Sequence, residues 1–333
     1  MRRDNLSYPF LFLAMLTPLS AQQFAPWRDP SHHAVQFVAV EKDVRLEVLD
    51  WGGSGRSVIL LAGGGNTAHV FDEFAEKLTT GFHVFGITRR GFGESDFSRS
   101  ENAIDRLRDD VLTVIDKLKL ERPALVGHSI AGAELSAIAT SHPERVAGLV
   151  YLEAGYPYAF GSGKGPTMKD FQIGGPQPPA PNDSDLSSFS ALQKWDAKVY
   201  GFRIPEAEFR QTWSTTSDGQ RPAKARDFPG AQAFMEIMTK TKTYTDIPVP
   251  ALVMFAIPNV QESWIDNATD TAVREEARTY YTRLNALKEQ QAKAFEVGVP
   301  SARVVRLQGR HYIFLSNETE VLREMRAFLS GLK

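Results

Sequence analysis

The sequence predicts an α/β fold, in which a mostly parallel, doubly wound sheet carries a helical lid between its sixth and seventh strands. Two observations support this prediction. Short apolar runs alternate with amphipathic stretches at helical spacing, as in a parallel sheet that helices cover on both faces. The alternation stops between about residues 158 and 247, where a Pro/Gly-rich linker and a segment rich in aromatic residues follow. Disordered segments lack this many aromatic residues, so we interpret the segment as a folded insertion.

The expected strands are short apolar runs that end in turns. Residues 44–51 alternate apolar and polar side chains, turn at Gly52–Gly55 and lead into an apolar run, which we interpret as a hairpin edge that precedes a buried strand. Further strands are expected at 82–88, 123–128, 146–153, 250–257 and 302–309. Helices are expected at 104–118, 130–141, 271–295 and 318–329, with shorter ones near 192–202, 206–213 and 231–239.

The first residues have the pattern of a secretory signal peptide. Arg2 and Arg3 precede an apolar run at 8–16, and Leu19–Ala21 offers small residues for cleavage. The run is too short for a permanent transmembrane helix. We therefore expect an exported protein, periplasmic or extracellular, without a stable membrane anchor; an amphipathic N-terminal helix is the alternative. The predicted organisation is a signal peptide at 1–21, a core formed by 22–157 and 248–333, and a lid at 158–247.

Composition narrows the classes of function. The chain has 333 residues, of which 42% are hydrophobic, a formal net charge of −2 and no cysteine. A chain without a long basic block is not expected to bind nucleic acid. The absence of cysteine excludes disulfides, thiolate nucleophiles and cysteine-ligated metals.

We expect no cofactor and no metal. The glycine-rich stretch AGGGNTAH at 62–69 lacks the lysine and serine of a phosphate-binding loop. The histidines and acids show no metal-ligand spacing, and we interpret the pair His32–His33 as solvent-exposed.

The stretch LVGHSIAGAELSAIA at 125–139 carries the strongest chemical signal. Gly127-His128-Ser129-Ile130-Ala131 fits the nucleophile-elbow pattern, with alanine in place of the last glycine, and it lies where a predicted strand meets a predicted helix. Such a turn exposes the serine at the carboxyl end of the sheet. The amide groups at the start of the helix can then stabilise negative charge on a reacting oxygen.

A serine hydroxyl needs a base to take its proton. Among the seven histidines, His311 lies between the last strand and the last helix, at the same carboxyl edge as Ser129. We therefore expect His311 to be the base. The alternative is a loop histidine that bonds only to backbone.

These features resemble the α/β-hydrolase family over almost the whole chain after residue 21. The resemblance rests on LLAGGGNTAHVF, RRGFGESD, GHSIAG, GLVYLEAG and GRHYIFLSN. It implies an oxyanion hole formed by the backbone amides of Gly64 and Ile130. The chain departs from the family at Ala62-Gly63, where many members have His-Gly, but backbone donors survive that change. We also expect His128, His69, Trp195 and Trp213 to line the substrate pocket.

The acid of the triad has two candidate positions. Most family members carry it after the penultimate strand, where this chain has Asn259, with Glu262 slightly later and Asp266 beyond. Glu153 instead ends an earlier apolar strand, as in some dehalogenase- and lactonase-like branches. A buried carboxylate is costly unless it is paired, so we expect Glu153 to be the acid and Glu262 the alternative. A structural salt bridge from Glu153 to Arg90 is the other explanation.

The sequence therefore predicts a secreted serine hydrolase that cleaves a small carboxylic ester or lactone, apolar or aromatic in character, through an acyl-enzyme on Ser129. Two alternatives use the same triad: an iminopeptidase-like peptidase or amidase, and a carbon–carbon bond hydrolase. An iminopeptidase would need acids in the lid to hold the substrate amine, and the predicted lid contains Asp196, Glu206, Glu208 and Glu236. A ligand-binding protein without turnover is a further alternative, which only Asn259 favours. The oligomeric state is not predicted.

Overall fold

The computed structural model describes residues 27–99, 103–239 and 243–333. The predicted signal peptide lies outside the described residues. Ser31–Lys333 forms one compact unit, which includes the segment predicted to be a lid. Within the described part of the chain, no helix combines the length and apolar character needed to cross a membrane.

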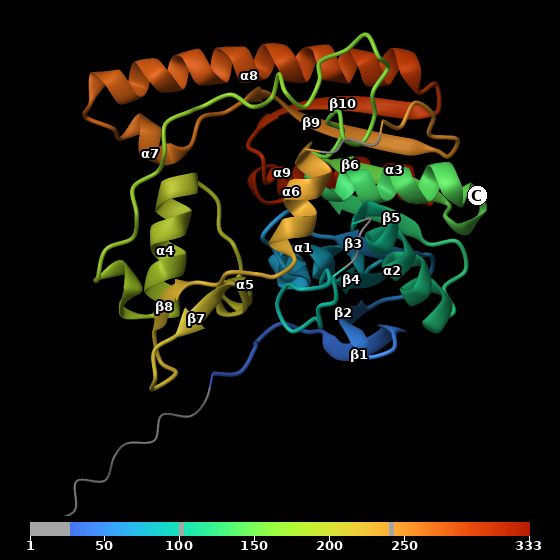
Figure 1. Cartoon of the computed structure of the whole chain (residues 1–333), viewed down its shortest axis with the longest axis horizontal. Coiled ribbons are helices and arrows are strands. Elements are labelled where there is room, and N and C mark those ends of the chain that lie inside the picture. The colour runs from blue at the N-terminus through green and yellow to red at the C-terminus, as the bar shows by residue number, and fades with distance from the viewer. Residues whose placement is uncertain (1–26, 100–102, 240–242) are drawn as a thin grey trace, which may run out of the picture. The chain divides into compact units, whose positions relative to one another are not determined.

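The central feature of this unit is an eight-stranded, mostly parallel sheet with the strand order β1-β2-β4-β3-β5-β6-β9-β10 (Figure 1). Only the β1–β2 and β2–β4 pairs of this sheet are antiparallel. The strands are β1 (Ala34–Glu41), β2 (Val44–Gly52), β3 (Ser57–Leu61), β4 (His83–Ile87), β5 (Ala124–His128), β6 (Gly148–Leu152), β9 (Ala251–Asn259) and β10 (Ala302–Gly309). The α/β fold class predicted from the sequence is confirmed.

The predicted hairpin between residues 44–51 and the next apolar run is wrong. The strand β2 pairs with β1 and β4, whereas β3 lies between β4 and β5. Local alternation identifies a strand but not its neighbour, and here β4 comes later in the chain and separates the two. The first strand, β1, is an addition to the predicted elements.

Helices cover both faces of the sheet. The longer ones are α2 (Ala103–Lys117), α3 (Ala131–Ser141), α8 (Thr271–Gly298) and α10 (Glu318–Ser330). The short ones are η1 (Ala68–Phe71), α1 (Asp72–Ala75), η2 (Glu76–Leu78), η3 (Pro143–Arg145), α7 (Ser263–Asp266) and α9 (Ile313–Ser316). In Figure 1, α8 lies along the β9–β10 edge. All four helices of the predicted core are present.

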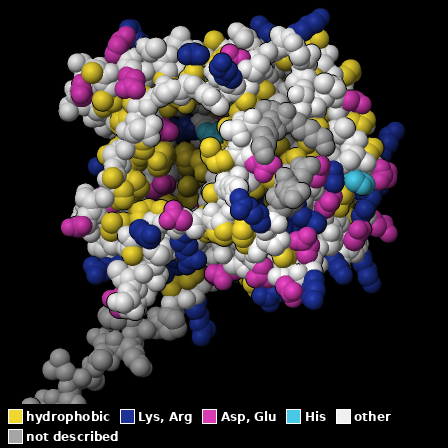
Figure 2. Space-filling view, viewed as in Figure 1, with side chains coloured by type: hydrophobic (Ala, Val, Ile, Leu, Met, Phe, Trp, Pro, Cys, Tyr) yellow, Lys and Arg dark blue, Asp and Glu magenta, His cyan; other side chains and the backbone are white. Residues whose placement is uncertain are grey.

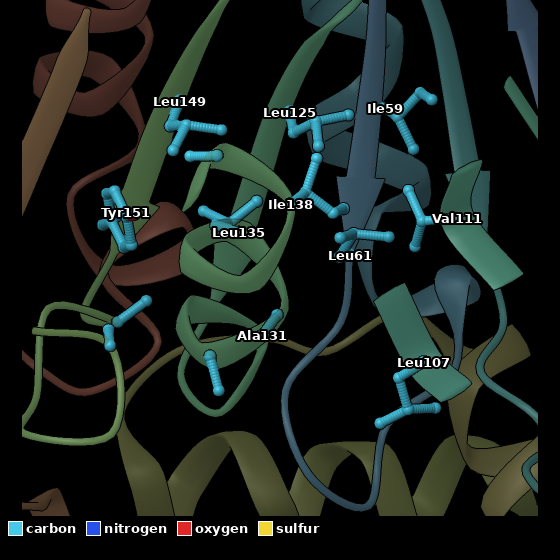
Figure 3. Close-up of a cluster of buried hydrophobic side chains, with 14 of the residues drawn as sticks. Ile59, Leu61, Leu107, Val111, Leu125, Ala131, Leu135, Ile138, Leu149 and Tyr151 are labelled. Atoms are coloured by element: carbon cyan, nitrogen blue, oxygen red, sulfur yellow. The ribbon is translucent and has the colours of Figure 1, made fainter. Parts of the chain in front are cut away.

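Alternating side chains of each strand enter two separate buried clusters, one on each face. Leu125 of β5 packs with α2 and α3, whereas its neighbour Val126 packs with α1 and α10. Figure 3 shows the first cluster, where Leu135 and Ile138 of α3 face the strands. Burial on both faces explains why these strands are continuous apolar runs. Where an apolar run stops, the strand ends at the carboxyl edge of the sheet.

The insertion between β6 and β9 contains η4 (Asp185–Ser187), α4 (Phe189–Tyr200), α5 (Glu206–Thr212), β7 (Trp213–Thr215), β8 (Pro222–Ala225) and α6 (Ala231–Thr239). Its three α-helices lie close to their predicted positions, and the β7–β8 hairpin adds to them. Ser188 caps the start of α4 by accepting a hydrogen bond from the amide of Ala191, and Gly201 ends it in the left-handed conformation. The function of this segment as a lid stays a prediction.

Candidate active site

Ser129 lies on a sharp corner between β5 and α3. Its φ of +52° is in the left-handed region, which is uncommon for a residue other than glycine. Its amide still donates to the carbonyl of Leu152, at 3.1 Å, so the corner is anchored to β6. A Cβ at Gly132 would lie 2.0 Å from the Ala154 carbonyl oxygen. The small residues of the motif therefore let the corner pack tightly and expose the Ser129 hydroxyl.

His311 follows β10 and faces this serine. Its Nε2 lies 3.0 Å from Ser129 Oγ. The neighbouring His128 is turned away from the cavity, and its Nε2 lies 3.0 Å from the carbonyl oxygen of His311. Burial and the adjacent His311 lower the pKa of His128 to about 3, so His128 is neutral and can donate to that carbonyl. His128 thus supports the His311 loop and does not line the pocket as predicted.

Glu153 lies at the end of β6 on a second corner of the same kind, with a φ of +49°. Its amide donates to the carbonyl of Met254 at 2.9 Å. The fully buried carboxylate places Oε2 3.3 Å from His311 Nδ1, and Oε1 accepts from the Ala256 amide at 2.5 Å. The hydroxyl of Tyr156 donates to Oε2 at 2.8 Å. Ser129, His311 and Glu153 therefore form one continuous chain of contacts.

Sequence reasoning missed Lys288, which lies on α8 and is 1% exposed. Its Nζ donates to Glu153 Oε2 at 2.7 Å and to Asn259 Oδ1 at 2.5 Å. Burial alone would raise the pKa of Glu153, but the charge of Lys288 and the contacts with His311 outweigh it and lower that pKa to about 2. Asn259, where most family members carry the acid, thus holds the cation that keeps Glu153 ionised.

The two alternatives to Glu153 as the acid have other partners. The Glu262 carboxylate accepts from Trp264 Nε1 at 2.8 Å, and Asp266 accepts from Gln261. Among the described carboxylates, only that of Glu153 contacts the His311 ring. Arg90 pairs with Glu41 and Asp110, so it is not the salt-bridge partner of Glu153.

Of the predicted oxyanion residues, Ile130 directly follows Ser129, and Gly64 follows Gly63, where a Cβ would lie 3.3 Å from Ser129 Cβ. Ile130 lines the same cavity, and the amides of Gly64 and Ile130 have no hydrogen-bond acceptor among the described residues. A Cβ at Gly64 would lie 2.5 Å from the Phe234 ring of α6, so only glycine allows this approach. The role of both amides as an oxyanion hole stays a prediction.

The loop that carries Gly64 is bound to the insertion. Glu208 of α5 is buried and accepts hydrogen bonds from Asn66 Nδ2 at 2.9 Å and from the Thr67 amide and hydroxyl. Asn66 Oδ1 in turn accepts from the hydroxyl of Tyr312, at 2.8 Å, next to His311. Burial raises the pKa of Glu208 to about 7, against the effect of these hydrogen bonds. Glu208 thus connects the insertion to the Gly64 loop, and Asn66 connects that loop to the loop of His311.

A cavity of about 370 Å³ opens at Ser129 and His311. Its walls come from the insertion, from α8 and from the loops after β9 and β10, and they are largely aromatic. Figure 2 shows hydrophobic side chains gathered in the hollow, with a histidine beside a basic side chain at one end. Tyr158 also lines it and interacts with Ser129. Burial and the charge of Glu153 raise the pKa of Tyr158 well above its ordinary value, so its hydroxyl stays protonated.

The other predicted pocket residues lie elsewhere. His69 is buried against Asp72 and Glu47, and Trp195 faces a separate hollow on α4. Trp213 packs against the second buried cluster. None of these three lines the cavity, because a place in the sequence does not set the direction of a side chain in the fold.

The expectation that His32 and His33 are both solvent-exposed is wrong for one of them. The His33 side chain is 3% exposed, and its Nδ1 lies 2.9 Å from Asp72 Oδ1.

Comparison with known proteins agrees with this architecture. A family model described as the alpha/beta hydrolase fold matches residues 56–175. The chain is 33% identical to the AB hydrolase superfamily protein YisY of Bacillus subtilis over 133 residues, 37% of this chain and 49% of that protein. It is 32% identical over 118 residues to a 2-hydroxy-6-oxononadienedioate/2-hydroxy-6-oxononatrienedioate hydrolase of Paraburkholderia phymatum, 34% of this chain and 41% of that protein. The matches thus span less than half of these curated relatives.

Solved structures are similar over nearly the whole chain. E-2-(acetamidomethylene)succinate hydrolase has a TM-score of 0.63 at 18% identity, which covers 90% of this chain and 100% of that one. Carboxylesterase CesB from Bacillus subtilis has a TM-score of 0.53 at 16% identity, with coverage of 91% and 93%. At this identity the likeness concerns the fold. Together with the family model over residues 56–175, it shows that the chain has the α/β-hydrolase fold.

Proposed function

We propose that the protein is an exported serine hydrolase that cleaves a carboxylic ester or lactone through an acyl-enzyme. The observation that carries this proposal is the chain of contacts from Ser129 through His311 to Glu153, beside two available backbone amides. A nucleophile, a base, an orienting acid and oxyanion donors are the parts that acyl transfer needs.

In the first half of the reaction, Ser129 Oγ attacks the substrate carbonyl while His311 Nε2 takes the hydroxyl proton. The amides of Gly64 and Ile130 stabilise the oxyanion, and His311 then gives its proton to the leaving oxygen. In the second half, His311 takes a proton from water, which attacks the acyl carbon; the bond from that carbon to Ser129 Oγ then breaks, and His311 returns the proton to Oγ. Glu153 stabilises the imidazolium in both halves because its carboxylate stays ionised.

The surroundings of the site favour an ester or lactone over a peptide with a free amino terminus. None of the four acids considered in the insertion, Asp196, Glu206, Glu208 and Glu236, lines the cavity. Glu208 is bound to the oxyanion loop instead. Carbon–carbon bond cleavage remains the second candidate, because one relative is named as a hydrolase of a 2-hydroxy-6-oxo dienedioate. Serine at position 129 argues against dehalogenase and epoxide hydrolase chemistry, which needs aspartate there.

The site also argues against a binding role without turnover. That alternative rested on Asn259, but Asn259 holds Lys288 next to Glu153, so a carboxylate is present one strand away. Export is proposed from the N-terminal pattern of Arg2, Arg3 and the apolar run at 8–16.

The test uses the chain from Gln22 onward with 4-nitrophenyl esters from acetate to decanoate, a set of lactones and a fluorophosphonate probe. We expect ester turnover and a single phosphonylated peptide that contains Ser129. The Ser129→Ala variant is the control and should lose both. A folded wild-type protein that is not labelled, and whose turnover never exceeds that of Ser129→Ala, would contradict the proposal.

A further inference from the structure

Arg310 precedes the proposed catalytic base and lines the same cavity as Ser129. Within the described residues, its guanidinium makes one side-chain hydrogen bond, from Nη2 to Ser263 Oγ at 3.3 Å. Its Nε is shielded from solvent and has no hydrogen-bond partner in the described structure. A guanidinium carries five N–H donors, so most of the donor capacity of Arg310 is unused.

Buried arginines elsewhere in the molecule have carboxylate partners. Arg89 donates to Glu134 at 2.6 Å, and Arg90 donates to Asp110 at 2.5 Å. Arg310 forms no ion pair with any described carboxylate. A half-buried cation normally has a partner, because burial without one costs free energy. A molecule bound in the cavity can supply a negatively charged partner for Arg310.

The other charged residues that line the cavity are not available to bind an anionic ligand. Lys288 is neutralised by Glu153 and bound to Asn259, so it is not available to a ligand. Glu262 also lines the cavity, but its carboxylate accepts from Trp264 Nε1 and forms no ion pair with Arg310.

The position of the guanidinium is fixed by close packing. A Cβ at Gly201 would lie 2.9 Å from Arg310 Cζ and 2.3 Å from Ser263 Oγ, so the glycine backbone at the end of α4 lies against both side chains. The left-handed φ of +80° at Gly201 also favours glycine there. The insertion thus holds the guanidinium at the cavity wall, where it can bind an anion in a planar, bidentate manner.

We propose that Arg310 is the anion subsite of this cavity and that the substrate carries a carboxylate at a distance from the scissile carbonyl. This inference rests on the proposed function. The largely aromatic remainder of the cavity would contact the carbon skeleton between the two groups. The preferred substrates are therefore half-esters of dicarboxylic acids, or lactones with a carboxylate substituent.

The test compares matched substrates. The 4-nitrophenyl monoesters of succinic, glutaric and adipic acid are each paired with the neutral ester in which an isopropyl group replaces the carboxylate. For at least one chain length, we expect the wild type to prefer the charged ester by about 10- to 100-fold in kcat/KM. In Arg310→Gln this charged-to-neutral ratio should fall to about 1, and Arg310→Lys should retain part of it.

Two further variants sharpen the test. Arg303→Gln, at an exposed arginine of β10 paired with Glu324, should keep the wild-type ratio. Glu262→Gln should raise the ratio, because it removes the carboxylate that Glu262 contributes to the cavity wall. A wild type that hydrolyses the neutral esters through Ser129 but shows no preference for any charged one overturns this inference and leaves the proposed function intact. A wild type that hydrolyses no ester overturns both.

Discussion

The ends of β6 and β9 lie side by side, and both contribute to the acid of the triad. In most of the α/β-hydrolase family this acid is a single residue that follows the penultimate strand. After β6, Glu153 turns its carboxylate toward His311 from a left-handed corner. After β9, Asn259 turns its amide oxygen toward Lys288, which in turn holds Glu153. The acid thus lies after β6, and a residue that supports it lies after β9, where most of the α/β-hydrolase family carries the acid. The comparison teaches that the loss of an aspartate at one strand end need not mean the loss of the triad.

The largest effect should come from Glu153→Gln. The glutamine cannot stabilise the imidazolium, so we expect kcat on a 4-nitrophenyl ester to fall by about 10³- to 10⁴-fold. The matched variant Glu262→Gln, at the alternative acid, should change kcat on a neutral ester by less than about threefold, because Glu262 does not contact His311. Steady-state kinetics of both variants would decide whether Glu153 or Glu262 is the acid. A larger loss in Glu262→Gln would place the acid after β9.

Removal of Lys288 should have the next largest effect. In Lys288→Met, only the contacts with His311 would still oppose the effect of burial on Glu153, so its pKa should rise from about 2. The active form is the carboxylate, which exists above that pKa. We therefore expect the acid limb of kcat/KM to move to higher pH, with a loss of about 10- to 100-fold at pH 6 that shrinks as the pH rises.

The variant should also be about 3–5 kcal/mol less stable, because it leaves a buried charge unpaired. Lys293→Met, an exposed position on the same helix, is the control and should leave both properties unchanged. A pH profile in Lys288→Met that parallels the wild type would mean that Lys288 only fills space.

A smaller effect is expected at the other strand end. Asn259→Ala removes one of the three hydrogen-bond acceptors of Lys288 Nζ and should lower kcat by about three- to tenfold. The double variant Glu153→Gln/Asn259→Asp should stay as inactive as Glu153→Gln, since position 259 faces Lys288 and not His311. Recovery of activity in the double variant would show instead that either strand end can supply the acid.

The smallest effect concerns stability and not turnover. The pKa of Glu208 is about 7, above its ordinary value of 4.5, so the folded protein holds this proton more strongly than the unfolded chain. Stability from this group is present at low pH and is lost as the pH rises through about 7. In thermal unfolding between pH 5 and 8, Glu208→Gln should flatten this decline. Glu206→Gln, on the same helix, should decline as the wild type does.

The sequence is sufficient to predict the chemistry at the strand ends. The apolar runs of β5 and β6 end abruptly at Ser129 and Glu153, and His311 follows the last strand, so their meeting follows from a parallel sheet. Lys288 cannot be predicted in this way, because it lies inside a helix of 28 residues whose other charged side chains mostly face solvent. Strand order also escapes prediction, since local alternation is the same whether or not β4 lies between β2 and β3.

The cavity wall is the part that the sequence predicts least well. Aromatic residues in an insertion often form a pocket, which favours Trp195 and Trp213, yet both lie outside the cavity. The residues that form its wall depend on how α4, α6 and α8 are oriented against the core, and composition does not carry that information. The role of Arg310 likewise depends on which carboxylates are near it in space.

The most direct test of the central claim is the proton between His311 Nδ1 and its carboxylate, which proton NMR detects as a far-downfield signal at low temperature. We predict that the wild type shows this signal, that Glu262→Gln and Asn259→Ala retain it, and that Glu153→Gln loses it. A signal that persists in Glu153→Gln and disappears in Glu262→Gln would contradict the claim, because His311 would then take its carboxylate from the loop after β9.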